Sequence, residues 1–335
     1  MILVTGGTGL LGAHLLFELC QQHEHIKAIK RKHASTALTE KVFGFYHPDP
    51  HTLLAKIEWV EADITDYFSL ETALRDVTQV YHCAALVSFR QKDAAAMLHI
   101  NTKGTENVVN ACLEQHVQKL LYVSSIAALG RAENDGMVDE NSPWKESKQN
   151  SVYGISKYRA EREIWRGIAE GLDAVIINPS VILGAGDWDK GSAELFSFVN
   201  KGLKHYTKGV NGYVYVKDVC RIMIQLMEGD IHNERFVVNA ENISYQQLFE
   251  SIAYAMGKTP PTKELSPKAV HIGRYLYALK DLLQGKAPRI TKQMAKNAIS
   301  TFRYNNQKLL DAINFNYTPI DKAVKEIAEV FKSED

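Results

Sequence analysis

Apolar and polar positions follow two different rhythms along the first half of the chain. Short apolar runs, such as ILVT at 2–5, are typical of buried strands. In LLGAHLLFELCQQ at 10–22, apolar residues recur every three or four positions, as in an amphipathic helix. The same alternation continues as far as Pro179. It predicts strands at 2–5, 25–30, 56–62, 79–85, 119–125 and 172–182, and helices at 10–22, 67–76, 93–115 and 151–169.

Strands that alternate with helices predict βαβ units, and right-handed crossovers then place helices on both faces of a parallel sheet. After Pro179 the alternation stops, turn-rich segments follow, and helical patterns dominate from Tyr245. We therefore expect an α/β fold, a doubly wound parallel sheet of the Rossmann type, with a smaller and mainly helical C-terminal lobe for a substrate. The predicted division assigns 1–178 and 213–240 to the dinucleotide-binding domain, and 179–212 and 241–335 to the lobe.

Composition narrows the classes of partner. The chain has 335 residues, 45% of them hydrophobic, which suits one large or two interleaved globular domains. Its 39 Lys and Arg residues balance 39 Asp and Glu residues, so no net field would attract nucleic acid or an anionic membrane. No apolar run reaches the ~20 residues of a membrane span, and a strand at residue two leaves no room for a signal peptide. We expect a cytoplasmic protein.

The four cysteines are scattered along the chain and form no C-x-x-C pair. We interpret Cys20, Cys83, Cys112 and Cys220 as reduced, small core residues. This pattern predicts neither a disulfide nor a metal site.

A glycine-rich turn, TGGTGLLG at 5–12, separates the first strand from the first helix. Glycines in this position allow a tight turn and a close approach of the backbone to a pyrophosphate, which then sits on the helix N-terminus. The spacing also fits G-x-G-x-x-G when it is counted from Gly7. The residues predicted to bind a dinucleotide here are Gly6, Gly9, Leu10, Leu11 and Gly12.

The end of the second predicted strand indicates which dinucleotide is bound. An acidic residue there would hold the ribose of NAD, but the chain reads Lys30, Arg31, Lys32, His33. A guanidinium can grip a 2′-phosphate bidentately, so Arg31 favours NADP(H) over NAD(H). Asp63, at the end of the third strand, would accept a bond from the adenine amino group, although a simple turn aspartate explains it nearly as well.

The pentapeptide YGISK at 153–157 places Tyr153 and Lys157 four residues apart, on one face of a predicted helix. Taken alone, an ordinary amphipathic turn accounts for it. Its significance depends on the motifs around it.

Together these motifs resemble the extended short-chain dehydrogenase/reductase family of the NAD-dependent epimerase/dehydratase superfamily, over nearly the whole chain. The likeness is closest to the dihydroflavonol 4-reductase and aldehyde reductase branch. The segments that carry it are TGGTGLLG, the pair Asp63-Ile64, YHCAALVSF, NTKGTENV, YVSSIAALG, YGISK, NPSVILGAG and VYVKDV. Their order and spacing favour a catalytic role for the Tyr and Lys of YGISK.

The resemblance implies that Ser125, Tyr153 and Lys157 are catalytic. Tyr153 would exchange the proton, Lys157 would lower the pKa of the phenol and hold the nicotinamide ribose, and Ser125, rather than Ser124, would bond the substrate oxygen. We expect His82 to be a satisfied strand-end histidine. The resemblance adds cofactor contacts at Ile64, Ala84, Ala85, Asn101, Pro179 and Val181, although Asn101 is equally well a polar helix residue. It places the substrate beside Phe89, Ser125, Leu129, Leu183 and Tyr213.

The resemblance implies an NADP(H)-dependent reductase of a ketone or aldehyde on a fairly apolar small molecule. A nucleotide-sugar epimerase, dehydratase or reductase and a non-catalytic NADP(H)-binding sensor are the alternatives. In nucleotide-sugar members, an Asn and a Tyr stand in the turn after the sixth strand, where this chain has Val181 and Leu183. Those members also have an Arg just before the V-x-D segment, where this chain has Asn211. The family also implies a possible homodimer through the helices at 93–115 and 151–169. The segments expected to shape the substrate pocket are 86–97, 129–147, 180–213 and the C-terminal lobe.

Overall fold

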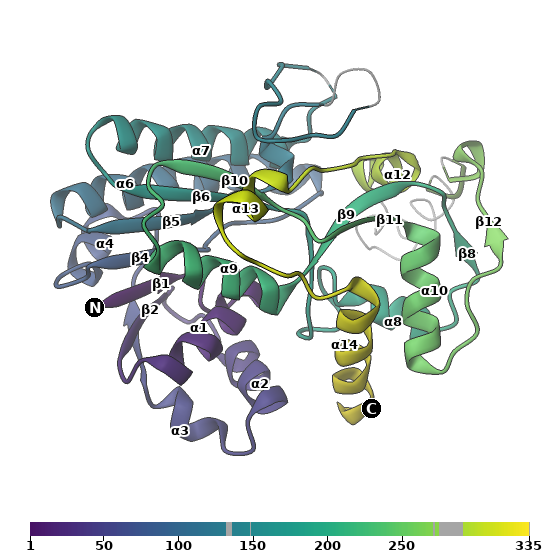
Figure 1. Ribbon diagram of the computed structural model, residues 1–335, viewed down its shortest axis with the longest axis horizontal. Helices are drawn as coiled ribbons and strands as arrows, with labels where there is room; N and C mark the ends of the chain where they lie inside the picture. The colour runs from purple at the N-terminus through teal and green to yellow at the C-terminus, as the bar shows by residue number, and fades with distance from the viewer. Residues whose placement is uncertain (132–135, 148, 271, 275–290, 335) are drawn as a thin grey trace.

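A seven-stranded parallel sheet forms the centre of the computed structural model, which describes residues 1–131, 136–147, 149–270, 272–274 and 291–334. Its strand order is β10-β6-β5-β4-β1-β2-β3, with β1 in the interior (Figure 1). The predicted doubly wound α/β class is confirmed. The strands are β1 (Ile2–Thr5), β2 (Ile26–Lys30), β3 (Ile57–Glu61), β4 (Gln79–His82), β5 (Lys119–Val123), β6 (Ala174–Pro179) and β10 (Glu234–Val238).

Helices cover both faces of this sheet, and for this reason its central strands are continuously apolar. On one face, α1 (Leu10–Gln22) and α9 (Val216–Glu228) share a core with the strands. On the other, the core is completed by α4 (Tyr67–Ala73), α6 (Gly104–Glu114) and α7 (Val152–Ala169). Figure 1 shows α6 and α7 along one side and α1 and α9 along the other.

The long helix predicted at 93–115 is present but not uniform. It runs through η1 (Gln91–Asp93), α5 (Ala94–Leu98) and η2 (His99–Lys103) into α6, and η2 is one turn of π-helix. Asn101 lies in that π turn and is buried. A π turn of this kind inserts one residue into a helix and re-aims a side chain, often at a functional site.

The run predicted as one strand at 172–182 is two strands of two sheets. β6 ends at Pro179, and the N–H of Ser180 donates to the carbonyl of Val238. β7 (Val181–Leu183) then joins a separate sheet of order β11-β9-β7, with β9 (Val210–Tyr215) and β11 (Glu241–Ser244). Sequence periodicity does not show this break, since both strands are apolar.

The C-terminal lobe therefore contains a small sheet besides its helices. β8 (His205–Tyr206) and β12 (Lys263–Glu264) add a short pair. Between β9 and β11 the chain returns to the large sheet as α9 and β10. The division into domains itself stays a prediction. The helices of the lobe are α8 (Glu194–Asn200), α10 (Tyr245–Met256), α12 (Lys292–Ile299), α13 (Gln307–Ala312) and α14 (Ile320–Glu334).

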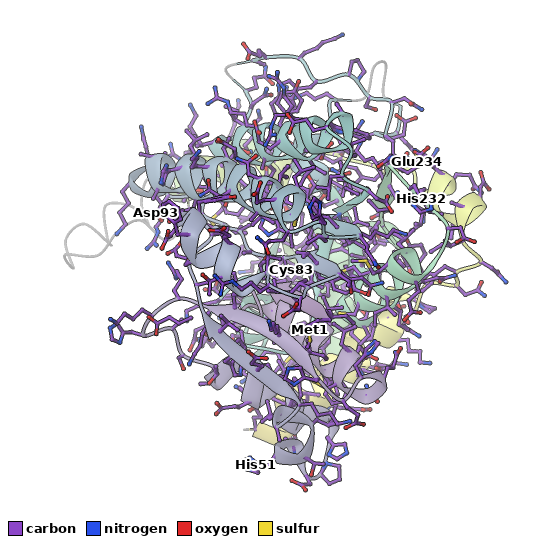
Figure 2. The ribbon with its side chains drawn as sticks, turned by 90° about the vertical axis from the view of Figure 1, so that its left-hand side faces the viewer. Met1, His51, Cys83, Asp93, His232 and Glu234 are labelled. Carbon is purple, nitrogen blue, oxygen red and sulfur yellow. The ribbon has the colours of Figure 1, made fainter. Side chains whose placement is uncertain are left out.

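Two helices between β2 and β3 were not predicted: α2 (Ala37–Tyr46) and α3 (Pro50–Leu54). α2 buries three of its ten residues and α3 one of five, so the apolar repeat is too short to detect. In Figure 2, Cys83 lies near the middle of the view and His51 of α3 at its lower end. α3 is therefore remote from the end of β4.

Three of the cysteines, Cys20, Cys112 and Cys220, are buried as predicted, Cys83 is half-buried, and all four are free. Among the residues that the structure describes, no helix is long and apolar enough to cross a membrane. Of the segments expected to shape a substrate pocket, 132–135 and 275–290 lie outside the described residues.

Candidate active site

The glycine turn and the end of β4 fold against each other. Gly6 has φ +72°, and a Cβ there would lie 2.7 Å from the backbone nitrogen of Ala84, while one at Gly12 would overlap the carbonyl oxygen of Gly6. Thr5 Oγ1 accepts a hydrogen bond from the N–H of Ala84 (3.1 Å). Glycine is therefore required at positions 6 and 12 for the backbone to pack in this way.

No side chain caps the N-terminus of α1, which begins at Leu10 behind the N-cap Gly9. The N–H groups of its first turn remain available to an anion, and a Cβ at Gly9 would meet Gly6 only at ordinary contact distance, 3.4 Å. Leu11 is half-buried against the core. The turn therefore fits the pyrophosphate of a dinucleotide.

A pocket of about 460 Å³ opens beside the ends of β2 and β3. It brings together Arg31 and Asp63, as predicted, with Lys32, His33 and Glu61 also in its wall. Arg31 is exposed and forms no ion pair with any described residue. Asp63 Oδ1 accepts hydrogen bonds from the N–H and Oγ1 of Thr65 (2.9 and 2.8 Å), so that oxygen closes a turn. The other oxygen remains available to a ligand.

Ser125 follows β5 in an extended conformation and begins η3 (Ile126–Ala128). Its Oγ accepts the N–H of Ala127 (3.1 Å), which leaves the hydroxyl proton free to be donated elsewhere. Tyr153 lies in the first turn of α7 and is hydrogen-bonded to Ser125. A Cβ at Gly154 would lie 2.8 Å from the carbonyl oxygen of Ala127, so this glycine permits α7 to approach η3 closely.

Lys157 is buried one turn further along α7, and its Nζ donates to the carbonyl of Val123 (2.7 Å). The ammonium also lies 4.4 Å from the ring centroid of Tyr122, a cation–π distance. Burial lowers the pKa of Lys157 to about 7, against the raising effect of the Glu161 and Cys83 side chains.

The expected lowering of the pKa of Tyr153 by Lys157 is not found. Burial raises the pKa of the phenol, and the hydrogen bond with Ser125 opposes that rise in part. The physical reason is that Lys157 is directed to the carbonyl of Val123 and is itself desolvated.

Asn101 supports the site through protein contacts. Its Oδ1 accepts the N–H of Leu86 (2.7 Å), and its Nδ2 donates to the carbonyl of Leu86 and to Ser156 Oγ (2.9 Å each). Ser156 Oγ donates in turn to the carbonyl of Tyr153 (2.8 Å). Asn101 thus ties the loop after Ala84 and Ala85 to the first turn of α7. Ser156 was not anticipated from the sequence.

His82 is held between two hydroxyl groups, as expected for a satisfied strand-end histidine. Its Nδ1 lies 2.7 Å from Thr5 Oγ1 and its Nε2 lies 3.1 Å from Thr105 Oγ1. Burial lowers the pKa of His82 to about 3, and Lys157 acts in the same direction. The ring is therefore neutral, and both of its nitrogens are engaged. Ile64, the residue after Asp63, is buried in the core, and its carbonyl accepts a bond from Asn107 (3.0 Å).

The predicted substrate-pocket residues fall into two groups. Phe89 is 40% exposed and its ring centroid lies 6.3 Å from that of Tyr153, so it stands beside the phenol. Leu183 has no exposed surface and Tyr213 is 1% exposed, both in the core of the small sheet, while Leu129 packs into another closed cluster. The assignment of Leu183, Tyr213 and Leu129 to the substrate pocket stays a prediction.

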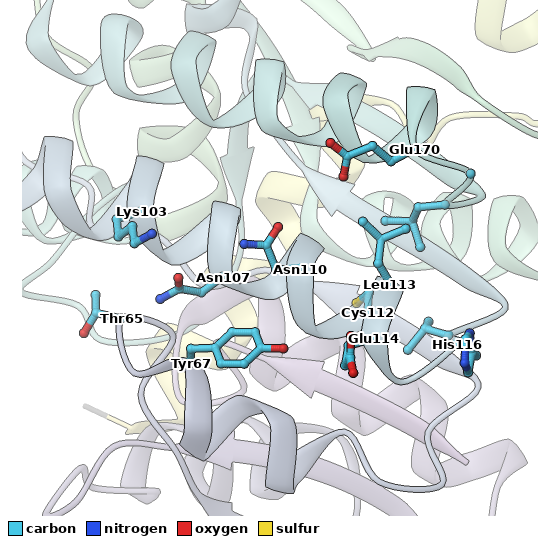
Figure 3. Close-up of a pocket in the computed structure, with 13 residues that line it drawn as sticks. Thr65, Tyr67, Lys103, Asn107, Asn110, Cys112, Leu113, Glu114, His116 and Glu170 are labelled. Carbon is cyan, nitrogen blue, oxygen red and sulfur yellow. The ribbon is translucent and has the colours of Figure 1, made fainter.

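Val181 is half-buried and pairs with Tyr213 across the small sheet, and Pro179 is buried at the end of β6. A larger hollow, of about 1050 Å³, lies elsewhere, on α6 and the loops beside it (Figure 3). Its wall includes Tyr67, Asn110 and Glu170, but none of the predicted site residues. The candidate site therefore lies at the ends of the strands, where the predicted groups meet.

The sequence profile of the NAD dependent epimerase/dehydratase family matches residues 2–239. The chain belongs to this family. Among its relatives, Sterol demethylase protein B of Methylococcus capsulatus is 25% identical over 92% of this chain and 88% of its own length. A putative dihydroflavonol 4-reductase of Synechocystis is 26% identical over 98% and 94%. The resemblance to extended short-chain dehydrogenases/reductases is thus confirmed.

The structures of other proteins share this fold. The structure of gox2253 superposes with a TM-score of 0.81 at 25% identity, covering 100% of this chain and 98% of that one. The UDP-glucose 4-epimerase of Thermus thermophilus, solved with NAD, gives a TM-score of 0.75 at 19% identity over 99% and 98%. Members of the family depend on a nicotinamide cofactor and include both oxidoreductases and epimerases, so family membership alone does not select the reaction.

Proposed function

We propose that the protein reduces a ketone or aldehyde on a fairly apolar small molecule, with NADP(H) as the hydride carrier and Tyr153 as the proton donor. The observation that carries this proposal is the meeting of Ser125, Tyr153 and Lys157 where the first turns of α7 pack against η3 and the end of β5. Binding of a nucleotide alone requires none of these three side chains, which weighs against the sensor alternative.

Each residue has a distinct task in this reaction. Gly6, Gly9 and Gly12 would hold the dinucleotide, whose reduced nicotinamide would supply the hydride for the carbonyl carbon. Tyr153 donates its Oη proton to the carbonyl oxygen as negative charge develops there, and its raised pKa keeps the phenol protonated until then. The hydroxyl of Ser125 donates a hydrogen bond to the same oxygen and keeps its proton. Lys157 offsets the charge of the phenolate that remains.

The surroundings of Tyr153 support an apolar substrate. Phe89 is 40% exposed, and its ring centroid lies 6.3 Å from that of Tyr153. Two relatives carry names that refer to apolar ring compounds: the putative dihydroflavonol 4-reductase and Sterol demethylase protein B. A panel of aromatic and alicyclic ketones and aldehydes, followed by the loss of NADPH absorbance, tests the proposal. Tight NADPH binding with no turnover across the panel would instead favour a sensor.

NADPH is expected to bind more tightly than NADH, because Arg31 stands where an acid would hold the ribose diol and lines the same pocket as Asp63. Replacing Arg31 by Asp removes the partner of the 2′-phosphate and adds a repelling charge. We expect the affinity for NADPH to fall by on the order of 10- to 100-fold, with NADH less affected. Calorimetric titration with both cofactors measures this. Lys41→Ala is a control, since Lys41 pairs with Glu334 away from the pocket. Equal affinities for NADPH and NADH in the unmodified protein would refute the predicted preference for NADPH.

UDP- and dTDP-sugars are expected to bind no better than about millimolar and not to be turned over. Asn211 stands where relatives that bind them place an arginine, and its Oδ1 already accepts the N–H of Gly212 (2.9 Å). Lys208, a possible substitute cation, is paired with Glu264 (2.7 Å) at the surface. Phosphate charge would be left poorly compensated. Calorimetry decides this, with NADPH as the positive control, and micromolar binding of any such sugar would establish the epimerase alternative.

A further inference from the structure

A buried carboxylate lies one helical turn beyond Lys157 on α7. Glu161 is 2% exposed, and its two oxygens accept three hydrogen bonds. Oε2 accepts from Ser124 Oγ (2.6 Å) and Asn178 Nδ2 (2.9 Å), and Oε1 accepts from Arg235 Nη1 (2.5 Å). These donors come from the end of β5, from β6 and from β10. Glu161 therefore joins three adjacent strands to the helix that carries Tyr153.

Asn178 extends this network to the backbone of Ser125. Its Nδ2 donates both to Glu161 and to the carbonyl oxygen of Ser125 (2.9 Å). A charged acceptor holds an amide more firmly than a neutral one, so Glu161 fixes the side chain of Asn178. The main chain of Ser125 is fixed through it.

Lys157 contacts the same stretch of β5. Its Nζ bonds the carbonyl of Val123 and lies over the ring of Tyr122. Tyr122 and Val123 therefore contact Lys157, and the next two residues, Ser124 and Ser125, belong to the Glu161 network. A displacement of this stretch would move Ser125 and the ammonium together.

The titratable groups that act on Lys157 come from three elements. His82 ends β4 and Cys83 follows it, Tyr122 lies on β5, and Glu161 shares α7 with the lysine. Burial lowers the pKa of His82 and raises the pKa values of the Cys83 thiol and the Tyr122 phenol, so all three are neutral at neutral pH. Among the described residues, Glu161 is the carboxylate that acts on this ammonium.

We propose that Glu161 is a positioning residue of this site: it holds the backbone of Ser125 through Asn178, and its charge keeps Lys157 protonated. The inference rests on the proposed roles of Ser125, Tyr153 and Lys157. Burial lowers the pKa of Lys157 to about 7, and Glu161 opposes that effect. The charge on Lys157 is present below this pKa and is lost as the pH rises through it.

Arg235 completes the arrangement. Besides Glu161, it donates to the carbonyl of Glu140, whose own Oε1 accepts the N–H of Val237 (2.6 Å). The guanidinium of Arg235 neutralises Glu161 in part. Removing the glutamate charge alone would therefore leave a poorly exposed cation unpaired, which destabilises a fold in its own right.

The test compares three variants of the full-length protein. In Glu161→Gln we expect kcat to fall on the order of 10- to 100-fold at neutral pH, because displacement of a reacting group is costly in rate. The KM for NADPH should stay unchanged. The high-pH limb of kcat should move to lower pH. Glu161→Asp retains the charge and should keep that limb near its wild-type position. The double variant Glu161→Gln/Arg235→Gln should recover thermal stability yet keep the shifted limb. Glu163→Gln, whose pair with Arg166 lies on the outer surface of α7, is the control.

A second measurement does not depend on turnover. The ¹³Cε resonance of Lys157, assigned by its loss in Lys157→Arg, reports the protonation of the ammonium. Its midpoint should move to lower pH in both variants that carry Glu161→Gln. An unmoved midpoint in these folded variants would overturn the proposal for Glu161. A moved midpoint in a protein that reduces no carbonyl would retain the role of Glu161 and refute the proposed function instead.

Discussion

Replacing Tyr153 by phenylalanine is expected to lower kcat for carbonyl reduction by about 10²–10⁴-fold, the range typical of lost acid–base catalysis. The substitution removes the hydroxyl that bonds Ser125 and leaves the ring that lies beside Phe89. The aromatic body stays, so the packing of α7 against η3 should persist. The affinity for NADPH should remain close to that of the unmodified protein, because the α1 turn and the pocket of Arg31 lie elsewhere.

Steady-state kinetics and calorimetry together measure this separation of turnover from binding. Tyr158→Phe is the matched control, since Tyr158 lies on the same helix and its ring stacks on Trp144 at a centroid distance of 4.4 Å. This stacking involves the ring, so the loss of the hydroxyl leaves the contact in place. Tyr158→Phe should leave kcat unchanged. Near-normal turnover in Tyr153→Phe would remove this residue from the mechanism.

Gly12→Ala is expected to unfold the dinucleotide turn or to destabilise the protein by about 3 kcal/mol or more, at the upper end of what overpacking causes. The added Cβ would overlap the carbonyl oxygen of Gly6 and lie 2.7 Å from its carbon. Neither atom can move away, because Gly6 itself is held against the backbone of Ala84. Thermal unfolding should show a lowered midpoint, and NADPH binding should be lost.

Two further glycines separate this effect from others. A Cβ at Gly9 meets Gly6 at 3.4 Å, so Gly9→Ala should fold normally yet bind NADPH more weakly if the pyrophosphate approaches there. Gly44, within α2, has open space around it, so Gly44→Ala should be neutral or slightly stabilising. A Gly12→Ala variant with unchanged stability would show that the turn is not packed as described.

The predicted Ser125, Tyr153 and Lys157 were identified from motifs alone, and the structure brings them together because α7 packs against η3, directly after β5. The environment of each group could not be predicted in the same way. Burial dominates the pKa of both Tyr153 and Lys157, and burial depends on strands and loops distant in the sequence. The expected influence of Lys157 on Tyr153 was for this reason overestimated.

Glu161 was overlooked, although one signal was present: it stands four residues after Lys157, on the same face of the helix. Its partners were not visible, since Asn178 and Arg235 follow it by 17 and 74 positions. Hydrophobicity alone also could not show that Leu183 is fully buried in the small sheet. A buried strand residue and a pocket residue have the same hydrophobicity.

The sequence by itself determined most of the alternation of strands and helices as far as β6, the place of the glycine turn and the spacing of YGISK. These depend on local periodicity, on glycine backbone freedom and on the pitch of a helix. Tertiary structure alone decided that the chain leaves the large sheet at Ser180, that Asn101 is hydrogen-bonded to the backbone of Leu86, and that Leu183 is fully buried. Each of these features depends on contacts between segments far apart along the chain. Such contacts leave no periodic trace in a single sequence.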